Sequence, residues 1–254
     1  MARIAAALCA GLALACTAQA QEDSPLTLGA GLHYSSGDYG TGNTTRIASL
    51  VATARYDAGP WTYRAAVPYL RVDGDTSVIL GVGPVRGGTA SSRTESGLGD
   101  IVLGATYAAY YDAASTFGVD LAGKVKLPTA DESKGLGTGE PDFVFLVDFY
   151  RSFDRVTGFA GIGYHILGDA PGLPLNNVWS ASLGASYRLD QRDSAGLSLD
   201  GRERAAPGSA RQRELTGFFT RKLDRFWKAQ LYALIGLADG SPDWGFGLSA
   251  ARPF

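Results

Sequence analysis

Hydrophobic and polar side chains alternate along most of this chain, and the alternation is clearest from residue 117 to residue 127. One face of that segment would carry no charge, whereas the other would carry Asp120, Lys124 and Lys126. A repeat of two residues predicts a β-strand with one apolar and one polar face. A tilted strand needs about 9 to 11 residues to cross a bilayer. This segment is therefore long enough to span a membrane.

The same alternation recurs along the sequence and predicts about twelve strands. We expect them at residues 26–34, 45–56, 61–72, 99–111, 117–127, 143–150, 156–166, 178–189, 194–202, 212–223, 227–237 and 244–254. Brief connections near residues 57, 112, 151, 190 and 224 alternate with longer ones near 35, 73, 128, 167, 203 and 238. Short turns at one end and long loops at the other are typical of bacterial outer-membrane barrels. The pattern predicts an all-β fold, a transmembrane antiparallel up-and-down β-barrel.

Composition decides which face of these strands meets the surroundings. Only 19% of the residues are charged and 34 are glycine, whereas soluble domains usually carry about 25% charge. The polar face consists more of Gly, Ala, Ser and Thr than of Lys and Glu. These features favour a barrel whose apolar face points outward into lipid. After residue 20 no segment approaches 18 uninterrupted apolar residues, which excludes transmembrane helices.

The first residues predict export from the cytoplasm. Arg3 precedes an apolar run from residue 4 to residue 15, and Ala18-Gln19-Ala20 resembles a cleavage site. We therefore expect a signal peptide at residues 1–20 and an outer-membrane barrel domain at residues 21–254, inserted by the barrel-assembly machinery. A lipoprotein site at Cys16 is an alternative, although Ala13 stands where Leu is usual.

Both cysteines of the sequence lie within this predicted signal, so the mature chain would lack disulfides and cysteine-based metal or catalytic sites. The net charge of -2 is too small to indicate a nucleic-acid partner. We expect outer-membrane lipid and small-molecule solutes as partners, and no cofactor.

Charged side chains on the polar faces are candidates for lining the barrel lumen. Paired charges across the lumen would hold the barrel in shape, whereas a mixed row of charges along a conduit would select solutes. Both interpretations involve the same residues. The candidates are Arg64, Asp100, Asp120, Lys124, Lys126, Asp148 and His165.

The segment from residue 128 to residue 142 predicts a charged loop at the outer mouth. Gly135, Gly137 and Gly139 resemble a phosphate-binding loop, but such loops lead into a helix and a strand follows here. The longer stretch at residues 73–96 would either fold inward as a constriction or present an apolar patch to a ligand. The charged residues expected at the rim are Asp131, Glu132, Lys134, Glu140 and Asp142.

Several positions predict local features of the barrel. Pro68 cannot donate a hydrogen bond to a neighbouring strand, so we expect a bulge or break there. Phe254 ends the chain as an aromatic residue, whereas Arg252 falls on the apolar face. Aromatic residues near strand ends predict girdles at the depth of the lipid headgroups. They are Trp61, Tyr69, Tyr107, Tyr111, Tyr150, Tyr187, Trp227 and Trp244.

Short motifs in the sequence resemble those of a known family. They are Val67-Pro68-Tyr69, Gly97-Leu98-Gly99-Asp100, Lys126-Leu127-Pro128-Thr129, Leu136-Gly137-Thr138-Gly139 and Asp142. From about residue 26 to residue 254 the chain resembles the outer-membrane proteins grouped as the phenol MetA-pathway family, which are often labelled transporters. The resemblance implies a barrel of the twelve-strand class that passes small, aromatic compounds, and it supplies no catalytic residues.

Our first functional hypothesis is an outer-membrane channel for passive uptake of small, aromatic or hydrophobic solutes. The alternative is a non-conducting structural or adhesion barrel whose loops bind a ligand. A hydrolase built on serine and on His33 or His165, the two histidines of the chain, is a further alternative. Neither histidine lies in a recognisable nucleophile motif, so we do not expect an enzyme.

Overall fold

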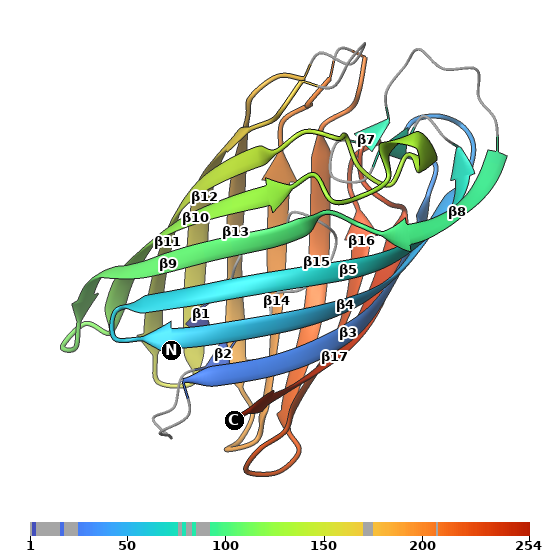
Figure 1. Cartoon of the computed structure of the whole chain (residues 1–254). Helices are drawn as coiled ribbons and strands as arrows, with labels where there is room; N and C mark the ends of the chain where they lie inside the picture. Colours follow the sequence, from blue (N-terminus) through green and yellow to red (C-terminus); the bar gives the residue numbers. More distant parts are fainter. Residues whose placement is uncertain are drawn as a thin grey trace.

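A computed structural model describes residues 2–3, 16–17, 25–75, 78–79, 83–84, 92–169, 175–206 and 208–254. Twelve long strands form a closed antiparallel barrel (Figure 1). They are β3 (Leu26–Gly37), β4 (Thr45–Ala58), β5 (Trp61–Asp75), β9 (Ile101–Asp112), β10 (Phe117–Leu127), β11 (Asp142–Phe153), β12 (Val156–Ile166), β13 (Val178–Arg188), β14 (Asp193–Arg202), β15 (Gln212–Lys222), β16 (Lys228–Gly236) and β17 (Trp244–Pro253).

The remaining elements are short. β8 (Ser92–Leu98) continues the wall along β5 beyond the start of β9. A 3-10 helix, η1 (Glu132–Lys134), lies in the loop after β10, and β6 (Val78–Ile79) pairs with β7 (Gly83–Pro84). β1 (Ala2–Arg3) pairs with β2 (Cys16–Thr17) inside the predicted signal peptide. The rest of that peptide lies outside the described residues, as does half of the stretch at 73–96. Among the described residues, no helix has both the length and the hydrophobicity to cross a bilayer.

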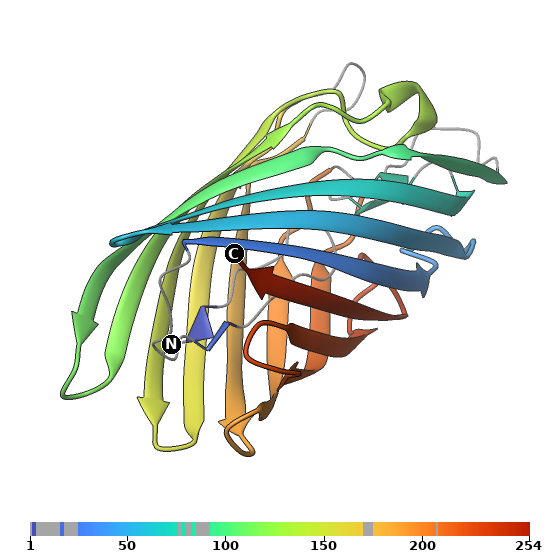
Figure 2. The ribbon, with the colours of Figure 1, turned by 60° about the horizontal axis from the view of Figure 1, so that its bottom comes forward.

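Each long strand pairs with its neighbours in sequence, and the last strand closes the barrel against the first. β17 pairs with β3 over ten residue positions, with Leu248 opposite Leu32 near the middle. The short turns gather at one end and the long loops at the other (Figures 1 and 2). The carboxyl end of the chain lies at the short-turn end, where the Phe254 amide donates to the Leu26 carbonyl at 2.8 Å. The predicted architecture is confirmed.

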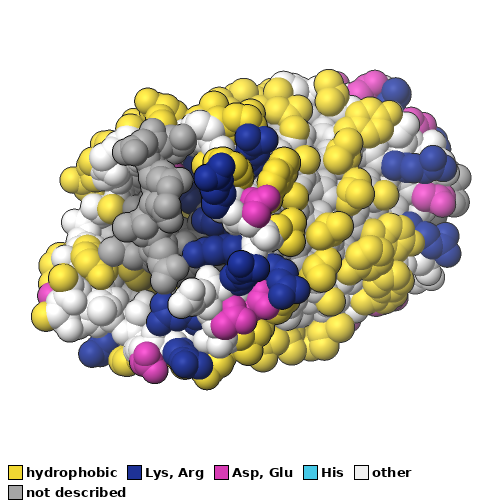
Figure 3. All heavy atoms as spheres, turned by 90° about the horizontal axis from the view of Figure 1, so that it is seen from below, with side chains coloured by type: hydrophobic (Ala, Val, Ile, Leu, Met, Phe, Trp, Pro, Cys, Tyr) yellow, Lys and Arg dark blue, Asp and Glu magenta, His cyan; other side chains and the backbone are white. Residues whose placement is uncertain are grey.

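Hydrophobic side chains point outward and polar ones inward. Leu32 and Leu50 are directly opposite on β3 and β4 and are 60% and 49% exposed, whereas His33 is only 7% exposed. Seen from below, hydrophobic side chains cover the wall in a broad band, with charged side chains gathered toward its edges (Figure 3). Water-soluble barrels show the reverse arrangement, so hydrocarbon is the environment that suits this wall. The inside-out prediction is confirmed.

The wall has a break at Pro68, as its missing amide proton predicts. β5 pairs with β9 up to Ala66 opposite Val102, and then with β8 from Tyr69 opposite Leu98. Gly99 and its neighbours therefore bulge out of register, and the Gly99 amide donates to the Pro68 carbonyl at 2.8 Å. On the other side of β5 the ladder to β4 is continuous.

A second irregularity, between β9 and β10, changes the face on which Tyr111 lies. The register of β9 against β10 shifts between Val119 and Asp120, so that Tyr110 pairs with the outward Val119 and Tyr111 with the inward Gly118. Strict alternation had placed Tyr111 on the apolar face. Tyr150, also expected in the girdle, pairs with Gly118 from β11 and is buried inside at 5% exposure.

Leu183 provides a test of which face meets lipid, because it lies midway along β13 and is 63% exposed. We expect Leu183→Arg to lower the free energy of unfolding by about 2–4 kcal/mol, the cost of an arginine at the bilayer midplane. Urea titration in phospholipid vesicles, followed by tryptophan fluorescence, measures this. Ser182→Arg is the matched control, since Ser182 faces the interior opposite Asp200. A larger loss for the control than for Leu183→Arg would reverse the assignment of the faces.

Candidate functional site

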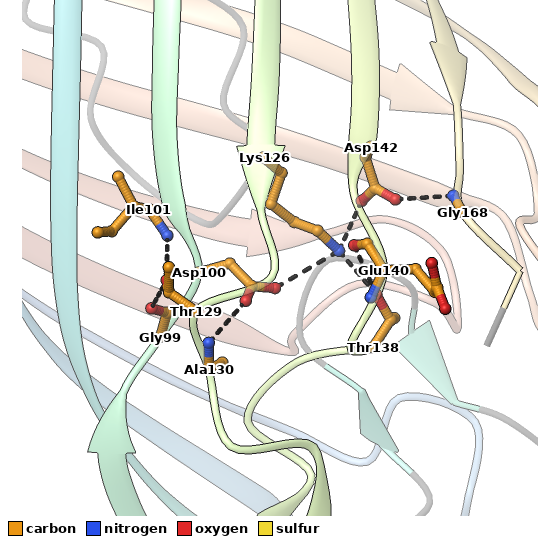
Figure 4. Close-up of polar contacts among 10 residues, drawn as sticks. All are labelled: Gly99, Asp100, Ile101, Lys126, Thr129, Ala130, Thr138, Glu140, Asp142 and Gly168. Carbon is orange, nitrogen blue, oxygen red and sulfur yellow. Dashed lines mark hydrogen bonds and ion pairs between the residues drawn. The ribbon is translucent and has the colours of Figure 1, made fainter. Parts of the chain in front are cut away.

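All the residues predicted to line the lumen lie on the inner side of the wall. Lys124 and Lys126 alternate along β10 with outward apolar residues, and Lys126 is 9% exposed. His165 is 5% exposed, whereas the next residue, Ile166, is 38% exposed. Asp100 lies just before β9, and its carboxylate points toward Lys126 (Figure 4). The full set is Arg64, Asp100, Asp120, Lys124, Lys126, Asp148 and His165.

The strand register arranges these charges in two parallel rows. Arg64 and Lys124 both lie directly opposite Gly104 on β9, which separates them. Asp120 and Asp148 lie directly opposite each other on β10 and β11. Like charges in that position destabilise a sheet unless opposite charges lie nearby. The adjacent basic row supplies them, so the interior holds a mixed charge pattern rather than a field of one sign.

The acidic row continues across the next strands to two residues that sequence analysis missed. From Asp148 the directly opposed positions are Gly161, Ser182 and then Asp200 on β14, which faces Glu214 on β15. On β14 the neighbouring Leu197 and Leu199 point outward and are exposed. Their alternation with polar residues was the signal that could have identified Asp200 and, by the same rule, Glu214.

An aromatic belt, defined here as Tyr150, Phe159, Phe218 and Tyr232, lies inside the barrel. The first three form a buried cluster, and Tyr232 packs against it. Each ring lies over a glycine directly opposite on the next strand, and a Cβ at any of these glycines would overlap the ring. Glycine is therefore required at these positions because the ring occupies the space of a side chain. The glycines are Gly118, Gly184, Gly196 and Gly247.

The two histidines bind partners on different parts of the inner wall. His33 Nδ1 lies 3.0 Å from the Tyr232 hydroxyl, and the two rings stack with centroids 5.6 Å apart. His165 Nε2 lies 2.8 Å from Ser180 Oγ. A hydrolase triad would need a carboxylate at His165 Nδ1 to orient the imidazole, but among the described residues this nitrogen is buried without a hydrogen-bond partner. This geometry does not favour the hydrolase hypothesis.

The loop at residues 128–141 has a defined conformation at the mouth. Asp131 caps η1 by accepting hydrogen bonds from the amide and hydroxyl of Ser133, and the hydroxyl bond lowers the pKa of Asp131. Gly135 ends the helix in the left-handed region at φ 69°. Lys134 lies 4.0 Å from Asp131, and both side chains are about half exposed. Glu132 and Glu140, also predicted at the rim, belong to the same loop.

Lys126 fixes this loop to the rim of the barrel (Figure 4). Its ammonium group lies 2.8 Å from Asp142 Oδ2 and 3.5 Å from Asp100 Oδ2, and it donates to the Thr138 hydroxyl at 2.8 Å. The second oxygen of Asp100 accepts from the Ala130 amide at 2.9 Å. Asp142 is thus buried at 3% exposure, and its other oxygen accepts from the Gly168 amide at 3.0 Å.

Apolar contacts hold the same loop against the inside of the wall. Leu136 is 2% exposed, and a Cβ at the inward position Gly97 would lie 3.0 Å from its Cδ1. Arg93 on β8 also donates to the Ser133 carbonyl at 3.1 Å. The loop is therefore fixed at the rim, attached to β8 on one side and to β10 and β11 on the other.

A family model described as "Putative MetA-pathway of phenol degradation" matches residues 29–201. The chain belongs to this family. The matched segment includes the Lys126 contacts and the Tyr150–Phe159 part of the aromatic belt, and it confirms the resemblance found in the sequence motifs. No functionally curated protein matches the sequence.

Solved structures share the barrel architecture at low sequence identity. An outer-membrane channel from Pseudomonas putida F1 superposes with a TM-score of 0.69 at 14% identity, covering 92% of this chain and 97% of that one. The β-domain of the Bordetella autotransporter BrkA gives 0.54 at 12% identity, covering 91% and 100%. The translocator domain of NalP from Neisseria meningitidis gives 0.54 at 9%, covering 92% and 90%. With its lipid-facing wall, this family member is a protein of the bacterial outer membrane.

Lys126→Met tests whether the ion pairs hold the loop. The substitution removes the cation shared by Asp100 and Asp142, and loss of one partner of a buried pair costs about 3–5 kcal/mol. We expect the loop to detach more often, so that trypsin cleaves after the exposed Lys134 on the order of tenfold faster or more, since cleavage follows the open population. Mass spectrometry of the fragments gives the rate.

Glu140→Gln is the control for the loop experiment, because it changes a charge of the same loop outside the Lys126 contacts. Its cleavage rate should match that of the unmodified protein. Equal rates for all three proteins would show that the loop stays in place without the lysine.

Proposed function

We propose that the barrel is an outer-membrane channel for passive uptake of small solutes, with aromatic or hydrophobic molecules as the preferred class. The observation that carries the proposal is the aromatic belt on the inner wall, bordered by the rows of charge. Aromatic rings inside a polar interior offer an aromatic or hydrophobic solute contacts that polar groups do not.

Tyr150, Phe159 and Phe218 are only 5–8% exposed, so a passing aromatic solute would contact the belt after these rings move apart. Tyr150 and Phe159 are directly opposite on β11 and β12, as are Phe218 and Tyr232 on β15 and β16. Aromatic pairs contribute about 0.5–1.5 kcal/mol beyond the burial of area. Contacts of that size retain a ring briefly without trapping it, and a solute must leave a channel as readily as it enters. The charged rows would meanwhile keep the passage hydrated.

The family description and one of the structural matches also support the channel proposal. The description of the family refers to phenol degradation, which concerns a small aromatic compound. One structure with this fold is described as an outer-membrane channel. Once the rings of the belt separate, the residues in contact with the solute would be those of the aromatic belt, with Arg64, Lys124, Asp120 and Asp148 beside them.

The loop at 128–141 favours one competing function. Because Lys126 and Leu136 fix this loop at the rim, it also offers a rigid surface, and rigid loops suit ligand binding by a non-conducting barrel. Flux measurements separate the two proposals, since only a channel admits solutes to a sealed vesicle.

Liposome swelling with a panel of benzoates, phenols and sugars tests the channel proposal. We expect barrel-containing vesicles to take up hydroxybenzoates faster than sugars of similar size, after subtraction of the protein-free rate. Phe218→Leu should reduce this preference by about two- to tenfold, the loss of one aromatic contact. Phe246→Leu is the control, because Phe246 is an aromatic residue of the lipid-facing wall and is 52% exposed. Uptake equal to that of protein-free vesicles would support the non-conducting barrel.

A further inference from the structure

Arg252 is a charged residue on the lipid-facing side of the barrel. In β17 it shares its face with Leu248 and Ala250, and it lies directly opposite the exposed Leu28 on β3. A cation in this position is costly in hydrocarbon and becomes favourable only near the headgroups. The solute pathway does not use Arg252, because it is on the outside of the wall.

Three aromatic rings surround the Arg252 guanidinium. Its central carbon lies 5.0 Å from the ring centroid of Phe254, 5.2 Å from that of Phe226 and 6.0 Å from that of Trp227. Cation–π contacts of this kind orient a guanidinium but leave its charge unneutralised. Within the described part of the chain, Nε of Arg252 is buried without a hydrogen-bond partner, and the side chain makes no ion pair.

A second guanidinium shares one of these rings. Arg225, in the turn between β15 and β16, lies 4.6 Å from the ring centroid of Phe226. Asp224 is in the same turn, but its Oδ1 already accepts from the amides of Trp227 and Phe226 at 2.7 Å each. These hydrogen bonds lower the pKa of Asp224, and the charges of Arg252 and Arg225 lower it further. Within this turn, Asp224 is therefore the carboxylate beside the two arginines.

The cluster lies at the depth of lipid headgroups. It belongs to the short-turn end of the barrel, which is the periplasmic end in this class of protein. Phe254 and Trp227 are 55% and 40% exposed there, as expected of interfacial aromatics.

We propose that Arg252 and Arg225 bind the phosphate of a phospholipid in the periplasmic leaflet. A guanidinium presents a planar fork of N–H donors that matches phosphate oxygens, and the rings pre-orient it. The acyl chains of that lipid would lie along the outward Leu28 and Leu248, which are 42% and 49% exposed. The site requires only that the barrel is in a membrane, so it stands or fails separately from solute uptake.

Native mass spectrometry of the barrel released from phosphatidylglycerol nanodiscs tests the site. We expect Arg252→Gln to lower the retention of phospholipid on the order of tenfold, the effect of losing one charged hydrogen bond, and the double variant with Arg225→Gln to lower it further. Arg213→Gln is the matched control, because Arg213 is an exposed residue of β15 near the long-loop end. Thermal unfolding in detergent establishes that each variant is folded.

Two further arms identify the ligand. A phosphate-free galactolipid should be retained weakly by the unmodified protein, and inorganic phosphate at millimolar concentration should not displace phosphatidylglycerol if the acyl chains contribute. Displacement by inorganic phosphate would assign the site to the free anion and overturn the lipid proposal. Equal retention by Arg252→Gln and the unmodified protein, or equal retention of the galactolipid, would leave Arg252 with a structural contact to its rings and would also overturn the proposal.

Discussion

Backbone hydrogen bonding in hydrocarbon is the constraint on which the structure depends. Lipid offers no partner to an unpaired N–H or C=O group, so a sheet that crosses a membrane must have no free edge. The pairing of β17 with β3 removes that edge, because each long strand then has a neighbour on both sides. Alternation follows from closure, since every second side chain must then face lipid and every other one the interior.

The interior is subject to a different constraint, because charged groups and aromatic rings must pack together inside a small barrel. Charges such as Lys124 and Asp148 remain inside because opposite charges lie in adjacent rows. Rings such as Phe159 and Phe218 fit because the positions opposite them are glycines. At the mouth, the buried ammonium group of Lys126 compensates the carboxylates of Asp100 and Asp142 and holds the loop at 128–141 in place.

Sequence patterns predicted the parts of this fold that repeat along each strand. The period of two placed Lys124, Asp148 and His165 inside, and the missing amide of Pro68 indicated the break in the wall. The pattern failed where the answer depends on another strand. The bulge that turns Tyr111 inward comes from the register of β9 against β10.

Side-chain packing also depends on residues distant in sequence. Tyr150 lies two residues after the inward Asp148, so alternation alone indicates its inner face, but the space for its ring comes from Gly118 on the neighbouring strand. Asp142 was expected in a charged rim, and the structure places it beside Lys126 as a buried partner. The same holds for Asp200 and Glu214, whose neighbourhood becomes clear only when the acidic row is followed from strand to strand.

The position of Asp100 has a mechanical consequence. This residue adjoins the bulge at Gly99, where β5 changes partner from β9 to β8, and it is also the anchor that Lys126 and Ala130 share. The loop at 128–141 and the break between β8 and β9 are therefore connected through Asp100. A displacement of the loop would act on the break as well. Widening of the entrance would therefore involve the strand ends beside β8 as well as the loop at 128–141.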